Sequence, residues 1–372
     1  MNRVLEGILA STERIIAATL KDPTVTVVRA QPRDFQVSGL ATKRQAVWLQ
    51  LEDNPSIGIK ACRVDHPEHF LEITSPLLDS DDPYSRHLAP EMQYLFSEQV
   101  GGQTYAIFHV PFYENSRDLF ALFNSGEGIR QSDQTIRKLL PVMCANASLH
   151  AKGIAHGDVK PANVLLVKRD AEEHGLLTDV NGAYYENIHY FSMSQTPHYL
   201  DASYYPSILY KSTDEQDFPR FDQYTDVFAW GLVLLESWCG ENMHEDFQNT
   251  IAVLNSNLLH SDVLGSFDSL RCNLVTFHRD PSILSSILEK SGTDTALSES
   301  ELNYQGRIID RKLAERQEIL FQFIDDMTQG SPKGFNELLK KMLGHERTER
   351  PQLSEVMACL ERMFLPQPRE YS

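Results

Sequence analysis

The stretch HGDVKPANVLL, residues 156–166, constrains the fold more than any other part of the chain. Pro161 and Asn163 interrupt an apolar neighbourhood, and the valine and leucines that follow are typical of a buried strand. The pattern predicts a tight loop that leads into a short β-hairpin. This loop carries the Asp158 carboxylate, the Lys160 ammonium group and an amide within one turn. These are the groups needed to orient a hydroxyl, neutralise a phosphate and hold a metal ion.

A second segment, LLTDVNG at residues 176–182, joins an apolar strand to an acid and then to a flexible corner. The two segments together resemble the catalytic loop H-R-D-L-x-x-x-N and the metal-binding D-F-G segment of protein kinases. Gly157 stands where that pattern has arginine, and Val180 and Asn181 stand where it has phenylalanine and glycine. Two such segments in the right order, with a hairpin between them, are far more specific than either one alone.

The resemblance implies an α+β, bilobal protein-kinase-like fold with a β-rich N-lobe and a mainly helical C-lobe. It divides the chain into an N-terminal helix and strand extension at 1–34, an N-lobe at 35–112, and a C-lobe at 113–372 with an enlarged helical insert at about 241–330. Runs of apolar residues predict strands at 24–28, 92–97 and 104–110, and helical spacing predicts helices at 1–20, 132–152 and 308–327. The resemblance implies further strands at 35–40, 46–51 and 57–62 and helices at 226–236 and 334–363. Gly101-Gly102 predicts a hairpin turn, and Pro141 predicts a kink in its helix.

The nucleotide site follows from the resemblance. Lys60, in the strand IGIKAC, would hold the phosphates and pair with a glutamate of the next helix, either Glu72 or, as a second choice, Glu68. Gly39 is the only glycine in the loop expected to cover the phosphates, and Phe112 lies in the expected hinge beside adenine. The alternatives are an edge-strand lysine in solvent and glutamates on a solvated helix face.

The resemblance also assigns the chemistry, with ATP and Mg²⁺ as cofactors. Asp158 would accept or orient the proton of the attacking hydroxyl, and Lys160 would steady the γ-phosphate, as in kinases of the serine/threonine type. Asn163 and Asp179 would hold Mg²⁺. The alternative is a buried polar cluster that only braces the hairpin, but Asp158 and Asp179 would then repel each other without a cation between them.

Three further positions match the family in part. Asp226 opens the segment DVFAWG and is expected to bind backbone amides of the 156–163 loop or His156, or to cap its own helix. Arg350 would pair with an acid of the activation segment, where Asp201 can replace the glutamate that is missing at Ser203. Gly157 leaves no arginine to pair with a phosphorylated activation loop, so activity is predicted not to depend on that switch.

Composition excludes several classes of function. A net charge of −18 argues against a nucleic-acid backbone as the main ligand. No apolar run is long enough to span a bilayer, and residues 1–6 do not resemble a secretion signal. The five cysteines are odd in number and form no C-x-x-C pair, which favours a reducing, cytoplasmic location.

The sequence therefore predicts a serine/threonine protein kinase that acts on a protein hydroxyl, with the 241–330 insert as a possible docking site for a partner. A pseudokinase that serves as a binding or scaffold module would explain Gly39 alone in its loop, Asn181 and Ser203. A kinase-fold nucleotidyltransferase would use the same metal site with ATP reversed. A small-molecule kinase is suggested by the H-G-D triplet but opposed by Thr196-Pro197, Asp226 and Arg350-Pro351.

Overall fold

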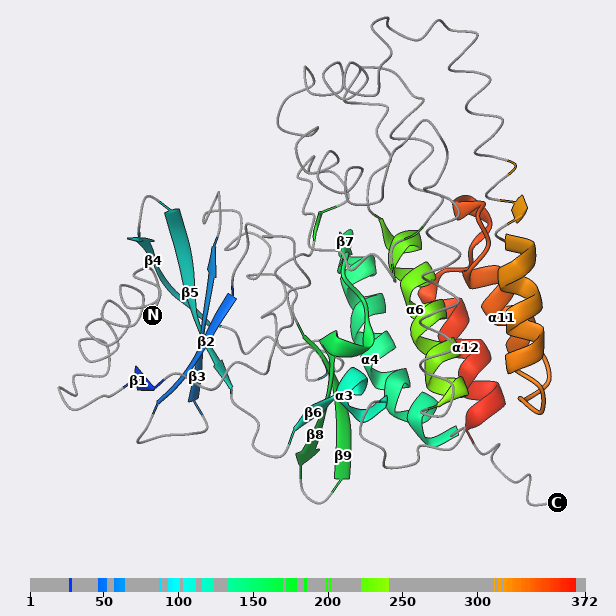
Figure 1. Cartoon of the computed structure of the whole chain (residues 1–372), viewed down its shortest axis with the longest axis horizontal. Coiled ribbons are helices and arrows are strands. Elements are labelled where there is room, and N and C mark those ends of the chain that lie inside the picture. Colours follow the sequence, from blue (N-terminus) through cyan, green and yellow to red (C-terminus); the bar gives the residue numbers. More distant parts are fainter. Residues whose placement is uncertain are drawn as a thin grey trace, which may run out of the picture. The chain divides into compact units, whose positions relative to one another are not determined.

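The computed structural model describes residues 27–28, 46–51, 57–63, 87, 93–100, 103–111, 116–123, 133–169, 172–178, 184–185, 199, 201, 222–240, 311, 314–315 and 317–365. The chain divides into two compact units, one made of residues 1–116 and 167–181 and the other of residues 117–166 and 182–372 (Figure 1). The expected helix at 1–20, the strand at 35–40 and most of the 241–330 insert lie outside the described residues. The predicted lobe boundaries stay predictions.

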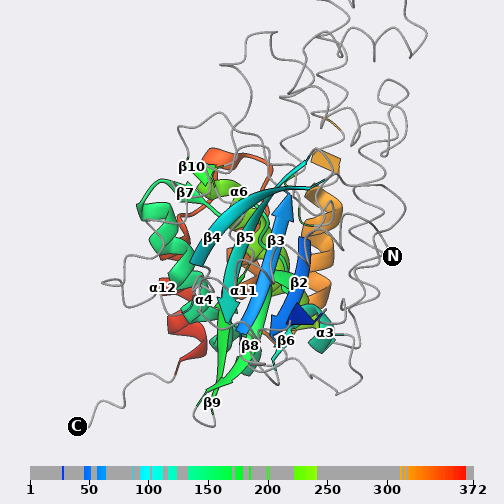
Figure 2. The ribbon, with the colours of Figure 1, turned by 90° about the vertical axis from the view of Figure 1, so that its left-hand side faces the viewer.

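The first unit contains a five-stranded antiparallel sheet in the order β1-β2-β3-β5-β4 (Figure 2). Its strands are β1 (Val27–Val28), β2 (Ala46–Leu51), β3 (Ile57–Arg63), β4 (Gln93–Val100) and β5 (Gln103–Pro111). Val100 pairs with Gln103, which confirms the hairpin predicted at the two glycines. The β-branched and aromatic residues of these segments favour extended backbone because such side chains pack well on a pleated surface.

Lys60 lies on an interior strand of this sheet. Its backbone is opposite Trp48 of β2 on one side and Phe108 of β5 on the other. The alternative that Lys60 lies on an edge strand is therefore wrong, and its position on β3 agrees with the strand expected from the V-A-I-K resemblance.

Strands that belong to two small sheets precede and follow the 156–163 loop in the sequence. Strands β6 (Arg117–Asp118), β8 (Val164–Arg169) and β9 (Glu172–Leu177) form a three-stranded sheet in the order β6-β8-β9, and β7 (Ile154–Ala155) pairs with β10 (Tyr184–Tyr185). The loop therefore begins at the end of one paired strand and ends at the start of another, and the second of these, β8, is the strand that the sequence predicts.

The core of the second unit is helical. Its helices are α3 (Leu119–Phe123), α4 (Asp133–Ala151), α6 (Gln223–Cys239), α11 (Phe335–Met342) and α12 (Leu353–Phe364), with a further helical stretch at 317–327. Every residue of α6 from Thr225 to Cys239 is buried, as expected for a helix that is apolar on all sides. α4 and α11 pack on α6, and α12 packs on α4 (Figure 1).

An aromatic cluster joins three of these helices. The ring of Trp238 on α6 lies 5.4 Å from that of Phe335 on α11 and 6.3 Å from that of Phe364 on α12, and the two phenylalanine rings are 5.3 Å apart. Tilted and edge-on pairs at such distances are favourable because the electropositive ring edge meets the electronegative face.

α4 runs without interruption from Asp133 to Ala151, although Pro141 lies inside it. It ends before Gly153, whose φ of +70° suits a glycine that terminates a helix. None of the helices among the described residues is both long and apolar enough to cross a membrane.

Gly231 generates a stability prediction, because a Cβ built there would meet Leu343 Cγ and Cδ2 at 2.9 Å and Met342 Cβ at 3.1 Å. We expect Gly231→Ala to lower the free energy of unfolding by about 1–2 kcal/mol, since overpacking outweighs the gain in helix propensity. Gly344→Ala is the matched control, because its Cβ would lie 3.5 Å from the nearest atom. Urea unfolding of both variants is the measurement, and an equal or higher stability for Gly231→Ala would contradict the packing argument.

Candidate functional site

The HGD loop, residues 156–163, connects β7 to β8 and ends in a short 3-10 turn, Pro161–Asn163. Gly157 has a φ of +77°, a backbone conformation that residues with a Cβ rarely adopt. Glycine therefore suits the path of the loop at the position where the family pattern has arginine.

The loop brings together three of the predicted site residues. Lys160 Nζ lies 2.7 Å from Asp158 Oδ2, and Asn163 Nδ2 donates to the Asp158 carbonyl oxygen at 2.8 Å and to Oδ2 at 3.1 Å. Asp158 and Asn163 are buried and Lys160 is half-buried. One carboxylate thus faces an ammonium group and an amide N–H, and both of these partners are donors.

The residues of the loop fit a magnesium ion. The Asn163 amide meets Asp158 through its nitrogen, so its oxygen, the kind of ligand that Mg²⁺ prefers, is outside that contact. The part of the chain that is described has no group of three or more histidine, cysteine or acidic residues that would form a metal site by itself. Asp179, the second predicted ligand, lies outside the described residues, as do Gly39, Glu72 and Phe112.

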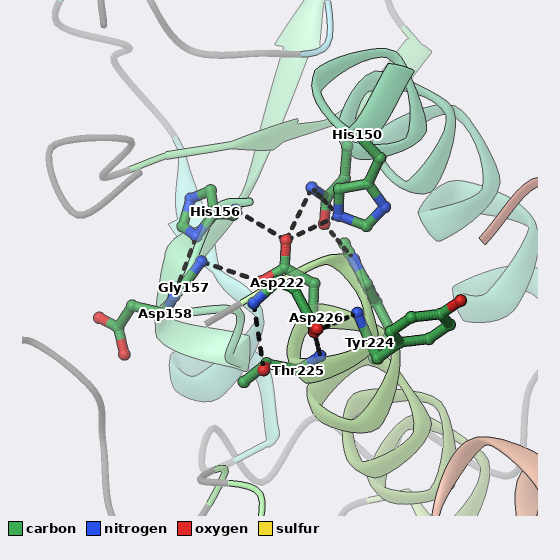
Figure 3. Close-up of polar contacts among 10 residues, drawn as sticks. His150, His156, Gly157, Asp158, Asp222, Tyr224, Thr225 and Asp226 are labelled. Atoms are coloured by element: carbon green, nitrogen blue, oxygen red, sulfur yellow. Dashed lines mark hydrogen bonds and ion pairs between the residues drawn. The ribbon is translucent and has the colours of Figure 1, made fainter. Parts of the chain in front are cut away.

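The Asp226 carboxylate lies beside the HGD loop and holds its backbone (Figure 3). Asp226 Oδ2 accepts a hydrogen bond from the His156 amide at 2.7 Å, and Oδ1 accepts one from the Gly157 amide at 2.9 Å. This confirms the predicted contact with loop amides. Asp226 does not cap its own helix, because Asp222 is the N-cap of α6 and accepts from the Tyr224 and Thr225 amides.

Asp226 remains ionised although it is almost completely buried. Burial by itself would raise the pKa of this carboxyl. The hydrogen bond from His150, the charges of the His150 and His156 imidazoles and the Gly157 amide outweigh that effect, so the pKa lies below its ordinary value. A buried acid with this many donors can fix a backbone segment without a metal ion.

A buried ion pair holds the activation segment to the C-terminal part of the chain. The Arg350 guanidinium donates to both oxygens of Asp201, at 2.5 and 3.0 Å, and neither side chain is accessible to solvent. Arg350 also donates to the carbonyl oxygens of Tyr224 and Gly344 and lies over the Phe228 ring. The prediction that Asp201 replaces the missing glutamate is confirmed.

Two sets of contacts were not predicted from the sequence. Tyr199 donates a hydrogen bond of 2.5 Å to Glu236, which is fully buried on α6, and Asn146 and His150 of α4 both donate to Asp226. Each set has a signal that sequence reasoning can use. Glu236 is an acid within an apolar helix, and Asn146 and His150 are polar residues four apart on the apolar side of α4.

The family model of the protein kinase domain matches residues 96–360, which is more than half of the chain. Among curated proteins none gives a significant match. The matched range includes the HGD loop, α6 and Arg350, so the resemblance found in the sequence is confirmed at the level of the superfamily.

The lowered pKa of Asp226 generates a prediction about acid stability. The carboxylate stabilises the fold at pH values above the unfolded pKa of about 3.9, and this contribution is lost as the pH falls through the lower, folded value. Asp226→Asn should therefore lower the free energy of unfolding by about 2–4 kcal/mol at pH 7, and this deficit should shrink below about pH 4. Urea unfolding from pH 3 to 8 measures both.

The control is Asp133→Asn, because Asp133 is exposed in the first turn of α4. Its effect should stay within about 0.5 kcal/mol throughout the pH range. A deficit for Asp226→Asn that is the same at pH 3 and pH 7 would show that the charge of Asp226 does not contribute.

Proposed function

Because the chain belongs to the protein kinase superfamily, we propose that it is an ATP- and Mg²⁺-dependent serine/threonine protein kinase. The observation that carries this proposal is the Asp158 carboxylate, held by Lys160 and Asn163 on a loop whose backbone is fixed by Asp226. Phosphoryl transfer requires positioning and charge neutralisation more than covalent chemistry, and this loop supplies groups for both.

Each residue of the loop has a part in the proposed reaction. Asp158 orients the substrate hydroxyl and accepts its proton. Lys160 contacts Asp158 through a flexible side chain, so it can also reach a phosphate oxygen while it stays beside the acid. Asn163 holds the Asp158 backbone and carboxylate through its nitrogen and offers its oxygen to the metal ion. Mg²⁺·ATP, when bound, supplies the phosphoryl group and neutralises its charge.

The remaining parts of the proposal come from the sequence. Lys60, on an interior strand of the five-stranded sheet, would hold the nucleotide phosphates together with Glu72, Gly39 and the hinge residue Phe112, and Asp179 would be the second metal ligand. Lysine two residues after Asp158 favours a serine or threonine hydroxyl as acceptor. Protein substrates, a partner on the 241–330 insert and a cytoplasmic location are proposed on the same basis.

The test is intact-protein mass spectrometry after incubation with Mg²⁺·ATP and a generic acceptor protein. Wild type should add phosphate mass, and Asp158→Asn should lower the rate by about 10²-fold or more, because a positioned general base contributes a factor of this size. Asp325→Asn is the matched control, since Asp325 also pairs with a lysine, Lys340, at 2.7 Å but lies outside the HGD loop. This control should keep the wild-type rate.

Other products would show that the protein has a different activity from the one proposed. A nucleotide mass on the acceptor would indicate nucleotidyl transfer, and phosphate on a metabolite instead of a protein would indicate a small-molecule kinase. Equal rates of ATP consumption in wild type and Asp158→Asn would show that Asp158 takes no part in the reaction. The absence of any product, together with no thermal shift on adding ATP, would favour the pseudokinase scaffold over an enzyme.

Gly157 generates a separate prediction about regulation. With no side chain at this position, the loop has no cation there to pair with a phosphorylated activation segment. Protein treated with phosphatase, and verified by mass as unphosphorylated, should therefore keep its kcat/KM within about twofold of untreated protein. A loss of activity that is restored by rephosphorylation would contradict this.

A further inference from the structure

The donors to Asp226 come from two different parts of the chain. The HGD loop supplies the His156 and Gly157 amides. Helix α4 supplies Asn146 Nδ2 at 3.2 Å and His150 Nε2 at 2.8 Å, and both are directed at Oδ2. Figure 3 shows His150 and the loop amides on opposite sides of this carboxylate. The proposed reaction gives no role to the two donors from α4.

The directions of the hydrogen bonds that Asp226 accepts from α4 follow from the neighbouring donors and from the carboxylate itself. Trp230 Nε1 can only donate, and it lies 2.7 Å from Asn146 Oδ1. The amide nitrogen of Asn146 therefore faces Asp226 and donates to it. Nε2 of His150 lies 3.2 Å from that nitrogen and 2.8 Å from Asp226 Oδ2, so it carries a proton and donates to the carboxylate as well.

The spacing on both helices produces this arrangement. Asn146 and His150 are four residues apart on α4, and Asp226 and Trp230 are four residues apart on α6, so each pair lies on one face of its helix. Asn146 and Trp230 are both completely buried. In such an environment a polar group that loses its partner cannot turn to water, so the cluster holds one orientation.

We propose that Asn146, together with His150, is a positioning residue for the HGD loop and acts through Asp226. The two donors from α4 fix the plane of the carboxylate, so that Oδ2 meets the His156 amide and Oδ1 meets the Gly157 amide. Those two amides immediately precede Asp158, and their position sets the backbone from which its carboxylate extends. The proposal rests on the proposed kinase activity only for its kinetic readout.

The first test is Asn146→Asp, which keeps the shape and the acceptor for Trp230 but removes the donor to Asp226. At pH 8 the introduced carboxylate is ionised and repels Asp226. Burial and the charge of Asp226 raise the pKa of the introduced group, so it takes up a proton as the pH falls and can donate again. The defect should therefore be present at pH 8 and recover toward pH 6.

Hydrogen exchange of the peptide 154–160, measured by mass spectrometry, reports the loop directly. In Asn146→Asp at pH 8 we expect the His156 and Gly157 amides to exchange about tenfold faster than in wild type at the same pH, with kcat lowered in parallel. At pH 6 both ratios should return toward one. His150, His156 and Asp226, the titratable groups in this cluster, are present in both proteins, so the ratio to wild type isolates the introduced group.

Asn336→Asp is the matched control. Asn336 Nδ2 donates to Asp325 Oδ1 at 3.3 Å on another face of the same unit, so this substitution also places a carboxylate beside an aspartate. It should change neither loop exchange nor kcat at either pH. Exchange of an α12 peptide reports global opening in every variant.

The His150 pair of variants keeps the proposal testable if Asn146→Asp does not fold at pH 8. His150→Gln retains an N–H near the position of Nε2 and should keep the loop amides protected from exchange. His150→Leu removes this donor and should lose that protection. Exchange in 154–160 that rises no more than in α12, or equal behaviour of His150→Gln and His150→Leu, would overturn the proposal.

The two proposals fail separately. If wild type transfers no phosphate but the loop amides respond as described, the kinase activity is wrong and the positioning role holds. If wild type is active and Asn146→Asp keeps both kcat and loop protection at pH 8, the positioning role is wrong.

Discussion

The buried carboxylate of Asp226 is the interaction on which the site depends. An unpaired charge at this depth would be very costly, so the surrounding structure must supply donors. It does so from α4 and from the HGD loop, and all of these donors meet the two oxygens of a single side chain. The same contacts that make the buried charge tolerable therefore fix the backbone that carries Asp158.

Polar groups of helix α6 hold distant segments of the chain at several points along the helix. Near its start, Asp222 caps the helix and pairs with Arg347, and the Tyr224 carbonyl accepts from Arg350. One turn later Asp226 holds the HGD loop, and near the end Glu236 accepts from Tyr199. A fully buried helix is rigid because it is packed on all sides, so segments far apart in the sequence are held to a common frame.

The contacts within the HGD loop are of a different kind, because Asp158, Lys160 and Asn163 meet over only two and five residues of chain. Such contacts follow from local backbone geometry. The sequence is therefore sufficient to predict that these groups lie together, and Pro161 and the strand after it are sufficient to predict the loop. The strands β2 to β5 end within three residues of the expected ranges, where β2 and β3 follow from the family resemblance and β4 and β5 from apolar runs on either side of turn residues.

Long-range partners were predicted only where the family pattern names both members, as for Asp201 with Arg350 and for Asp226 with the loop. The Asn146, His150 and Trp230 contacts were not predicted, because helical spacing shows which residues share a face but not which face of another helix it meets. The alternative role of Asp226 as an N-cap was wrong for a local reason. The helix begins at Gln223 and is capped by Asp222 in a capping box with Thr225, so Asp226 lies one turn inside it.

The sequence by itself determined the superfamily, the order of the strands and helices that were matched, and the chemistry available on the HGD loop. These depend on residue type and on spacing within one turn or one strand. The tertiary structure alone decided that Asn146 and His150 donate to Asp226, because these donors lie 80 and 76 residues away in the sequence. A carboxylate that is buried must find its partners in space, and only the packing of α4 against α6 brings them within hydrogen-bond distance.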